Sequence, residues 1–328
     1  MNDHPVVLIT GASSGIGRAT AQLLAQNGCR VFGTSRSPAK TRAIPGVTFL
    51  ALDVHSPQSV QECVQAVLDQ AGRIDALVNN AGLIGPGGAS EETSLDQVRA
   101  LFDTNFFGVV QVTNAVLPVM RQQRSGTIIN ISSAGGQVSA PPFFSFYAAS
   151  KHAIEGYSEG LRYEVRPFNI QVAMIQPGYT STEIGDSITP PDHPVADYVE
   201  TRQRMLMIDR AGIRYGTPPG EVARTVLKIL GQSRPALRNP VGSDGRAILL
   251  LKRFMPHPLF ERLIEWMYLT WQPKCVTGDI PSPAELGLHR FLFHRPTRDL
   301  TLRAAAAALF AAAGLGALAV LLHPSRKR

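Results

Sequence analysis

The chain of 328 residues is 44% hydrophobic and 17% charged, which excludes an intrinsically disordered polypeptide and suits one large α/β domain with additions. Its net charge of +7 would suit an anionic membrane or a phosphate-bearing ligand. Nucleic acid is disfavoured because Lys and Arg form no run with interleaved aromatic residues. Cys29, Cys63 and Cys275 lie too far apart for a disulfide framework or a metal site, so a reducing compartment is favoured.

Short apolar runs alternate with segments of helical periodicity from the N-terminus onward. The runs are continuous and rich in β-branched residues, which indicates strands buried on both faces of a parallel sheet. The first run begins so soon after Met1 that no signal peptide is expected. The six predicted strands are residues 6–9, 30–34, 47–52, 76–78, 127–131 and 170–175.

Helix signals lie between these runs. Ser56-Pro57 supplies an N-cap and a first-turn proline for one helix, and Ser94-Leu-Asp-Gln97 predicts a capping box at the start of another. This alternation predicts right-handed crossovers and a Rossmann-like, doubly wound α/β fold in three layers, α/β/α. The ligand of such a sheet lies at the carboxyl ends of its strands.

The pattern changes after the sixth predicted strand. Residues 185–216 contain several prolines and are expected to form a lid over the substrate, with a short helix at 198–208. A clearer helix is predicted from Thr217-Pro218-Pro219 through Leu230. We therefore divide the chain into a catalytic domain, 1–245, a helical extension, 246–302, and a hydrophobic tail, 303–328.

A glycine-rich segment joins the first predicted strand to the first predicted helix. Its sequence is Thr10-Gly11-Ala12-Ser13-Ser14-Gly15-Ile16-Gly17. Glycines let the backbone approach a diphosphate, and the helix N-terminus offers free N–H groups and positive potential. Because the motif lies in the strand–turn–helix context that this chemistry requires, it predicts a dinucleotide site.

Further motifs follow the glycine-rich segment in a fixed order. They are Asn79-Asn80-Ala81-Gly82, Asn105-x-x-Gly108, Ser132-Ser133, Tyr147-x-x-x-Lys151, and Pro177-Gly178 followed by Thr182. Together with the spacing Gly-x-x-x-Gly-x-Gly, these motifs resemble the short-chain dehydrogenase/reductase family over residues 5–245. The resemblance implies an oxidoreductase that interconverts a carbonyl and an alcohol with a nicotinamide dinucleotide, in a homodimer or homotetramer.

Tyr147 and Lys151 can be interpreted from their chemistry. Reduction of a ketone needs a proton donor beside the carbonyl oxygen and a dipole that holds this oxygen. Residues four apart share a helix face, and an ammonium beside a phenol favours the phenolate, so we expect Lys151 to lower the pKa of Tyr147. The pair predicts an acid/base site at the start of a helix.

The family resemblance implies the other roles. Ser133 would orient and polarise the substrate oxygen, with Ser132 as the alternative, and Asn105 would hold a water that relays protons from Lys151. Lys151 would also bind the nicotinamide ribose, and Thr182 the carboxamide. The residues implied to bind the dinucleotide are Gly11, Ser13, Ser14, Gly15, Ile16, Gly17, Arg36, Asp53, Asn80, Tyr147, Lys151, Pro177, Gly178 and Thr182.

The choice of dinucleotide depends on the end of the second predicted strand. An acidic residue there would bind the ribose hydroxyls and repel a 2′-phosphate. This chain has Ser35-Arg36 instead, and an arginine can pair with a phosphate and stack on adenine. We therefore expect NADP(H) to be favoured over NAD(H), with Asp53 at the adenine amino group as the resemblance implies.

The C-terminal segment 304–322 contains no charged or polar residue. A helix of this length would span about 28 Å, close to the roughly 30 Å of a bilayer core. It is alanine-rich, so an ordinary packing helix is the alternative to a membrane anchor. An amphipathic stripe from Leu259 to Trp271 would suit the membrane interface beside such an anchor. The catalytic domain is expected in the cytoplasm.

The sequence thus predicts an NADP(H)-dependent carbonyl–alcohol oxidoreductase. Apolar and aromatic residues of the lid region suggest a lipid-like substrate such as a steroid, retinoid or fatty carbonyl, although packing of the lid would explain them equally well. A nucleotide-sugar epimerase or dehydratase is disfavoured by the glycine spacing. A dinucleotide-binding sensor or scaffold without turnover is the alternative from another class, and the presence of both Tyr147 and Lys151 disfavours it.

Overall fold

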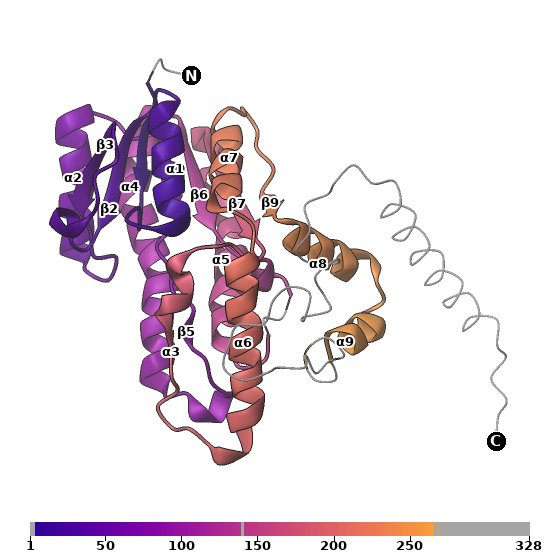
Figure 1. Ribbon diagram of the computed structural model, residues 1–328. Coiled ribbons are helices and arrows are strands. Elements are labelled where there is room, and N and C mark those ends of the chain that lie inside the picture. Colours follow the sequence, from indigo (N-terminus) through magenta and orange to yellow (C-terminus); the bar gives the residue numbers. More distant parts are fainter. Residues whose placement is uncertain (1–3, 139–140, 266–267, 269–328) are drawn as a thin grey trace, which may run out of the picture. The chain divides into compact units, whose positions relative to one another are not determined.

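A computed structural model of the protein describes residues 4–138, 141–265 and 268 (Figure 1). The proposed membrane anchor at 304–322 and most of the predicted helical extension lie outside these residues. Trp271, at the end of the amphipathic stripe, also lies outside them.

Seven parallel strands form the central sheet in the order β3-β2-β1-β4-β6-β7-β9. All six strands predicted from apolar runs are present, which confirms the doubly wound α/β fold. The seventh, β9, pairs with β7 at one edge; its short sequence Arg-Asn-Pro-Val contains no apolar run and gave no signal. The strands are β1 (Val6–Ile9), β2 (Arg30–Ser35), β3 (Val47–Ala51), β4 (Ala76–Asn79), β6 (Gly126–Ile131), β7 (Ile170–Pro177) and β9 (Arg238–Val241).

Helices cover both faces of this sheet (Figure 1). Alternate residues of β1 belong to separate cores: Leu8 packs with residues of α2, α4 and α5, and Ile9 with residues of α1 and α7. Burying each large side chain of these cores contributes about 1.5–3 kcal/mol, and the two cores hold the strand ends in register. The helices are α1 (Gly15–Gln26) and α7 (Pro219–Leu230) on one face, and α2 (Pro57–Ala71), α4 (Gly108–Gln123) and α5 (Ser145–Val165) on the other.

The helix starts follow the predicted capping with one correction. The Ser56 side chain accepts a hydrogen bond from the backbone N–H of Ser59 at the start of α2. Ser94 likewise caps α3 (Leu95–Phe102) through the N–H of Gln97. The Gln97 side chain, however, does not complete a capping box. It donates to the carbonyl of Pro190 and accepts from the N–H of Asp192, so it fastens the lid instead of the helix.

The predicted lid consists of short elements and one long helix. A 3-10 helix (Glu183–Ser187) leads into β8 (Ile188–Thr189), which pairs with β5 (Gly85–Pro86) in a separate two-stranded sheet. A second 3-10 helix (Ala196–Tyr198) precedes α6 (Val199–Tyr215). The expected helix at 198–208 is therefore present but runs seven residues further, to Tyr215.

Glu92 is the centre of the contact between the predicted lid and the rest of the domain. Its side chain is fully buried, pairs with Arg202 of α6, and accepts N–H groups from Val195 and Ala89. Burial alone would raise the pKa of Glu92, but these hydrogen bonds and the Arg202 guanidinium hold it below its ordinary value.

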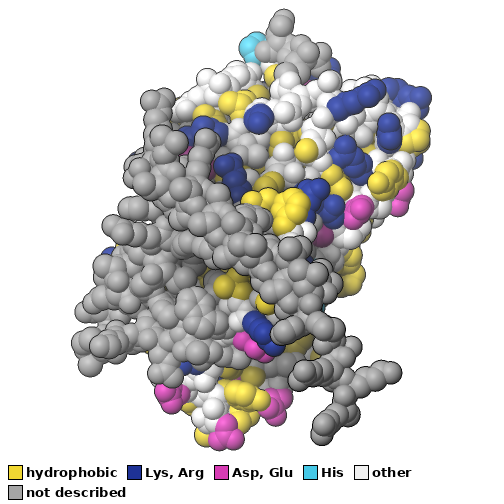
Figure 2. Space-filling model, turned by 90° about the vertical axis from the view of Figure 1, so that its right-hand side faces the viewer, with side chains coloured by type: hydrophobic (Ala, Val, Ile, Leu, Met, Phe, Trp, Pro, Cys, Tyr) yellow, Lys and Arg dark blue, Asp and Glu magenta, His cyan; other side chains and the backbone are white. Residues whose placement is uncertain are grey.

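After β9 the chain continues in two helices, α8 (Ser243–Phe254) and α9 (His257–Glu265), which begin the predicted helical extension. Large apolar side chains remain exposed on them: Leu250, Phe254 and Leu259 are 50%, 61% and 42% exposed. Among the residues described here, no helix combines the length and apolar character needed to cross a bilayer. Figure 2 shows one face of the molecule, where Lys and Arg side chains gather over the upper part with some acidic ones among them, and further acidic side chains lie at the lower end.

Candidate active site

One cavity of about 720 Å³ lies along the carboxyl ends of the strands. Every residue that we expected to bind dinucleotide or substrate lines it, except Gly17 and Asn105. The loops after β1, β2 and β3 contribute one end, around Gly11, Arg36 and Asp53, and the loop after β6 and helix α5 contribute the other, around Ser133 and Tyr147. Motifs far apart in the sequence therefore meet in one elongated site.

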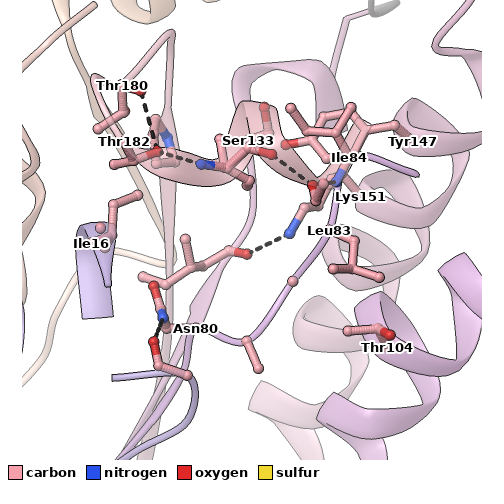
Figure 3. A pocket seen from close by; sticks show the side chains of 18 of the residues that line it. Ile16, Asn80, Leu83, Ile84, Thr104, Ser133, Tyr147, Lys151, Thr180 and Thr182 are labelled. Carbon is pink, nitrogen blue, oxygen red and sulfur yellow. Dashed lines mark hydrogen bonds between the residues drawn. The ribbon is translucent and has the colours of Figure 1, made fainter. Parts of the chain in front are cut away.

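The glycine loop at the start of α1 leaves space that side chains would fill. Gly11 and Gly15 have φ values of +64° and +50°, in the region that favours glycine. A Cβ on Gly17 would lie 2.3 Å from the carbonyl oxygen of Gly11, so Gly17 lies behind the cavity wall and permits close packing of the turn. The Asn80 amide holds this turn by donating to the carbonyls of Thr10 and Gly11 at 3.0 and 2.9 Å (Figure 3).

These features fit a dinucleotide. The N-terminus of α1 offers backbone N–H groups, and its N-cap, Ser14, makes no side-chain cap hydrogen bond. Arg36 is exposed at the end of the cavity. Asp53 lies on the neighbouring strand end, where its carboxylate accepts the N–H of His55. A diphosphate at the glycine loop would leave an adenosine moiety between Arg36 and Asp53.

Ser133, Tyr147 and Lys151 lie together at the other end of the cavity (Figure 3). Ser133 follows β6 and accepts the backbone N–H of Gly135, which orients its hydroxyl. This hydroxyl also hydrogen-bonds to Tyr147. Lys151, one turn along α5, donates from Nζ to the carbonyl of Ile131 at 3.0 Å and lies 5.8 Å from the centre of the Tyr147 ring.

Burial has the largest effect on the pKa values of both Tyr147 and Lys151. It raises the pKa of Tyr147 to about 12, with Asp209 adding a smaller contribution and the Ser133 hydrogen bond opposing it. Burial also lowers the pKa of Lys151 to about 8. The expectation that Lys151 depresses the pKa of Tyr147 was therefore wrong for this structure, because desolvation of the phenolate outweighs the nearby ammonium. At neutral pH the phenol keeps its proton.

Ser132, the alternative to Ser133, points elsewhere. Its Oγ is buried and has no hydrogen-bond partner among the described residues, and it lies 2.7 Å from the position that a Cβ on Gly136 would take. Of the two serines, Ser133 acts as hydrogen-bond partner of Tyr147 and opposes the rise of its pKa, which favours Ser133 as the partner of the phenol.

Asn105 lies behind the cavity wall in a π-helical turn (Asp103–Phe107) between α3 and α4. Its side chain accepts the N–H of Leu83 at 2.8 Å and donates to the carbonyl of Leu83 and the hydroxyl of Ser150. These bonds attach the loop after β4 to α5. The structure thus gives Asn105 a clear positioning function, whereas its expected role in a proton relay stays a prediction.

A turn after β7 forms the wall between the two ends of the cavity. It contains Pro177, Gly178 and, further on, Thr182, whose hydroxyl accepts the N–H of Ile184. The Asp244 carboxylate accepts the N–H of Tyr179 at 2.7 Å, and a Cβ on Gly178 would lie only 2.3 Å from Asp244. Glu183 accepts the N–H of Gly15 at 3.1 Å, so its carboxylate lies at the N-terminus of α1.

Sequence reasoning missed several residues of the cavity. Asp209 of α6, Asp244 of α8 and Tyr268 line it, as do Leu83, Ile84 and Phe144. Asp209 did leave a signal, because it interrupts the apolar segment Met205-Leu-Met-Ile-Asp209 on a helix that packs inward. The other missed residues reach the cavity through contacts between segments far apart in the sequence, which no local sequence pattern predicts.

Comparison with known proteins agrees with this geometry. A family model described as short chain dehydrogenase matches residues 5–192. The chain belongs to the short-chain dehydrogenase family.

Relatives in this family span most of the chain. One is the 3-ketodihydrosphingosine reductase of Bacteroides thetaiotaomicron, 44% identical over 72% of this chain and 87% of the relative. Another is retinol dehydrogenase 8 of Bos taurus, 33% identical over 83% of this chain and 93% of the relative. The solved structure of a short-chain dehydrogenase from Streptomyces avermitilis superposes with a TM-score of 0.69 at 32% identity, covering 82% and 98% of the two chains. The chain is therefore an oxidoreductase that acts on alcohol or carbonyl groups.

Proposed function

We propose that the protein reduces a ketone on a long apolar molecule and that the dinucleotide it uses is NADPH. The observation that carries this proposal is that Tyr147 lies beside Ser133 and Lys151, in a cavity that continues to Arg36. A proton donor at one end and a basic residue at the other are what carbonyl reduction with a 2′-phosphorylated dinucleotide requires.

The dinucleotide would supply the hydride. The residues that would hold the dinucleotide are those of the glycine loop, Arg36, Asp53, Asn80, Thr182 and the Pro177-Gly178 turn. Ser133 would hold the carbonyl oxygen, and Tyr147 would donate its proton to that oxygen as negative charge develops. The ammonium of Lys151 would stabilise the resulting phenolate. Asn105 keeps the loop after β4 and α5 together, and we retain its role in proton return to Lys151 as part of the proposal.

Preference for NADPH is supported by the charge at the end of β2. Arg36 is exposed toward the cavity, and no carboxylate occupies this strand end, where an NAD-binding chain carries an acidic residue. Asp53 belongs to the next strand end, and its carboxylate is engaged with the N–H of His55.

An apolar substrate is supported by the walls around Tyr147. Ile84, Phe144 and Ile213 form a small core there, against which Tyr147, Tyr179, Ile184, Ile188 and Leu206 pack. The names of two relatives, a 3-ketodihydrosphingosine reductase and a retinol dehydrogenase, favour a lipid-like ketone or alcohol. The non-catalytic sensor or scaffold is the alternative, and the assembled Ser133, Tyr147 and Lys151 disfavour it.

The decisive experiment measures oxidation of NADPH by the purified full-length protein with long-chain ketones and short-chain ketones of matched structure. We expect turnover that rises with chain length and that is slower with NADH. Dinucleotide binding without turnover of any ketone would favour the sensor or scaffold instead.

We also propose that the protein associates with membranes, from which an apolar substrate would enter. Leu250 and Phe254 are exposed on α8, whose last turn carries the basic residues Lys252 and Arg253, and Leu259 is exposed on α9. Exposed apolar and basic side chains together suit an anionic interface. The apolar segment 304–322 supports the same proposal from the sequence.

Full-length protein should sediment with anionic vesicles, whereas a chain ending at Arg298 should bind them more weakly. Equal sedimentation of the two chains would remove the anchor from the proposal.

The family also implies a homodimer or homotetramer, and light scattering of the purified protein would measure this oligomeric state.

A further inference from the structure

Asp209 is a carboxylate in the substrate end of the cavity for which the proposed reaction has no use. It lies on α6, is 6% exposed, and lines the same cavity as Ser133 and Tyr147. The negative charge of Asp209 contributes to the raised pKa of Tyr147. Because Tyr147 would face the carbonyl oxygen, Asp209 lies near the reacting end of the substrate and not near the end of a long chain.

A buried carboxylate is costly unless hydrogen-bond donors or a cation satisfy it. The Tyr179 hydroxyl donates a hydrogen bond to Asp209, and this bond and the charge of the exposed Arg210 both act to lower the pKa of Asp209. Its Oδ2 atom is nevertheless buried without a hydrogen-bond partner in the part of the chain that the structure describes. Burial raises the pKa of Asp209 to about 6, so most of these carboxyl groups are still ionised at neutral pH.

Asp244 in the same cavity shows what a carboxylate with a structural function looks like here. It is similarly buried, but it accepts backbone N–H groups of Tyr179, Gly245 and its own residue. These bonds position the turn after β7. Among the described residues Asp209 has no comparable set of donors, so its carboxylate is left available to a group that enters the cavity.

We propose that Asp209 binds an ammonium group on the carbon next to the substrate carbonyl, and that the substrate is a long-chain 2-amino ketone. This inference rests on the proposed ketone reduction and specifies its substrate. The apolar walls around Ile84, Phe144 and Ile213 would accept the alkyl chain, and the carboxylate would accept the cation. The hydroxyl of a neutral retinol or steroid could donate a hydrogen bond to Asp209, but it would leave the buried negative charge without a cation.

The experiment compares two substrates with the same chain, a 2-amino-3-ketone and the 3-ketone without the amino group, both with NADPH. In the unmodified protein we expect kcat/KM to be higher for the amino ketone. Asp209→Asn should reduce this ratio about 100-fold, mainly through KM, because a buried charge pair loses one partner. Glu200→Gln, on the same helix but exposed, should keep the ratio.

Loss of activity toward both ketones in equal proportion would show that Asp209 only supports the fold, and the inference would be overturned. If the unmodified protein reduces neither ketone, the proposed function itself fails, whereas reduction of both without preference refutes only the inference. A second measurement needs no variant: a long-chain primary amine should inhibit reduction of the 3-ketone at lower concentration than the alkanol of equal length. Equal inhibition by the amine and the alkanol would also overturn the inference.

Discussion

The two ends of the cavity are built in different ways. The dinucleotide end uses strand ends and a glycine turn that lie within residues 6–53, and its shape depends on backbone conformation. The substrate end combines segments from α5, α6, α8 and the β5–β8 pair, held by side-chain contacts such as Glu92–Arg202. The dinucleotide end thus depends mainly on local backbone conformation, with Arg36 as the side chain proposed to select the cofactor, and long-range packing determines what substrate can enter.

The largest expected effect comes from Tyr147→Phe, which tests the chemistry at the substrate end alone. The change removes only the hydroxyl that would donate the proton, so kcat for ketone reduction should fall about 1000-fold. NADPH affinity, measured by titration of NADPH fluorescence, should stay within about threefold because the ring remains.

Tyr163→Phe serves as the matched control, since this tyrosine of α5 is exposed and does not line the cavity. It should leave kcat unchanged. Near-normal kcat in Tyr147→Phe would remove this residue from the proposed mechanism.

The second largest effect is expected at the contact that holds α6, at the substrate end of the cavity, to the rest of the domain. Glu92→Gln removes a buried charge paired with Arg202, and we expect the free energy of unfolding at pH 7 to fall by about 3 kcal/mol. The pKa of Glu92 is lowered in the folded protein, so its stabilisation is present above the ordinary glutamate pKa of about 4.3 and is lost as the pH falls through the lowered folded value.

Urea unfolding of both proteins between pH 3 and 7 would measure this difference. Glu91→Gln is the control, because the neighbouring Glu91 is exposed and accepts a hydrogen bond from the hydroxyl of Tyr198. Its effect should stay below about 1 kcal/mol. A pH-independent difference between unmodified protein and Glu92→Gln would contradict the charge-based explanation.

At the dinucleotide end, Arg36→Asp should weaken NADPH binding by about 2 kcal/mol, or roughly 30-fold, because a phosphate loses a charged hydrogen-bond donor and meets a carboxylate. Binding of NADH should weaken much less or improve. Steady-state kcat/KM with both dinucleotides measures the change in preference.

Arg42→Asp, another exposed arginine nearby that does not line the cavity, should keep the preference of the unmodified protein. If Arg36→Asp lowers kcat/KM equally with NADPH and NADH, the proposed contact between Arg36 and the 2′-phosphate is wrong.

The smallest effect is expected from Glu183→Gln, which lies where the two ends meet. Its carboxylate accepts the N–H of Gly15, the position that a diphosphate would need. Removing this charge should tighten dinucleotide binding up to about fivefold. Isothermal titration calorimetry with NADP would show it, with exposed Asp186→Asn as the control. Weaker binding in Glu183→Gln would mean that Glu183 supports the loop instead of competing with the ligand.

The contrast between the two ends also explains what the sequence could predict. Six strands and the cavity residues from Gly11 to Thr182 were predictable because apolar runs and ordered motifs mark strand ends directly. Strand β9, the bonds from Gln97 to the lid, and Asp209 were not predicted, since their positions depend on contacts across the fold. The pKa of Tyr147 was predicted in the wrong direction because a linear sequence shows the nearby Lys151 but not the burial of both groups.

The contacts of Glu92 with the predicted lid have a consequence for amide hydrogen exchange in this part of the molecule. Bonds from residues 91–97 reach Pro190, Asp192, Val195, Tyr198 and Arg202, so α6 and the start of α3 share one buried anchor. Segments that share such an anchor exchange their amide protons as one cooperative unit. In deuterium-labelling mass spectrometry, peptides from α3 and α6 should therefore gain mass together, and Glu92→Gln should accelerate both while β1 and β4 keep their protection.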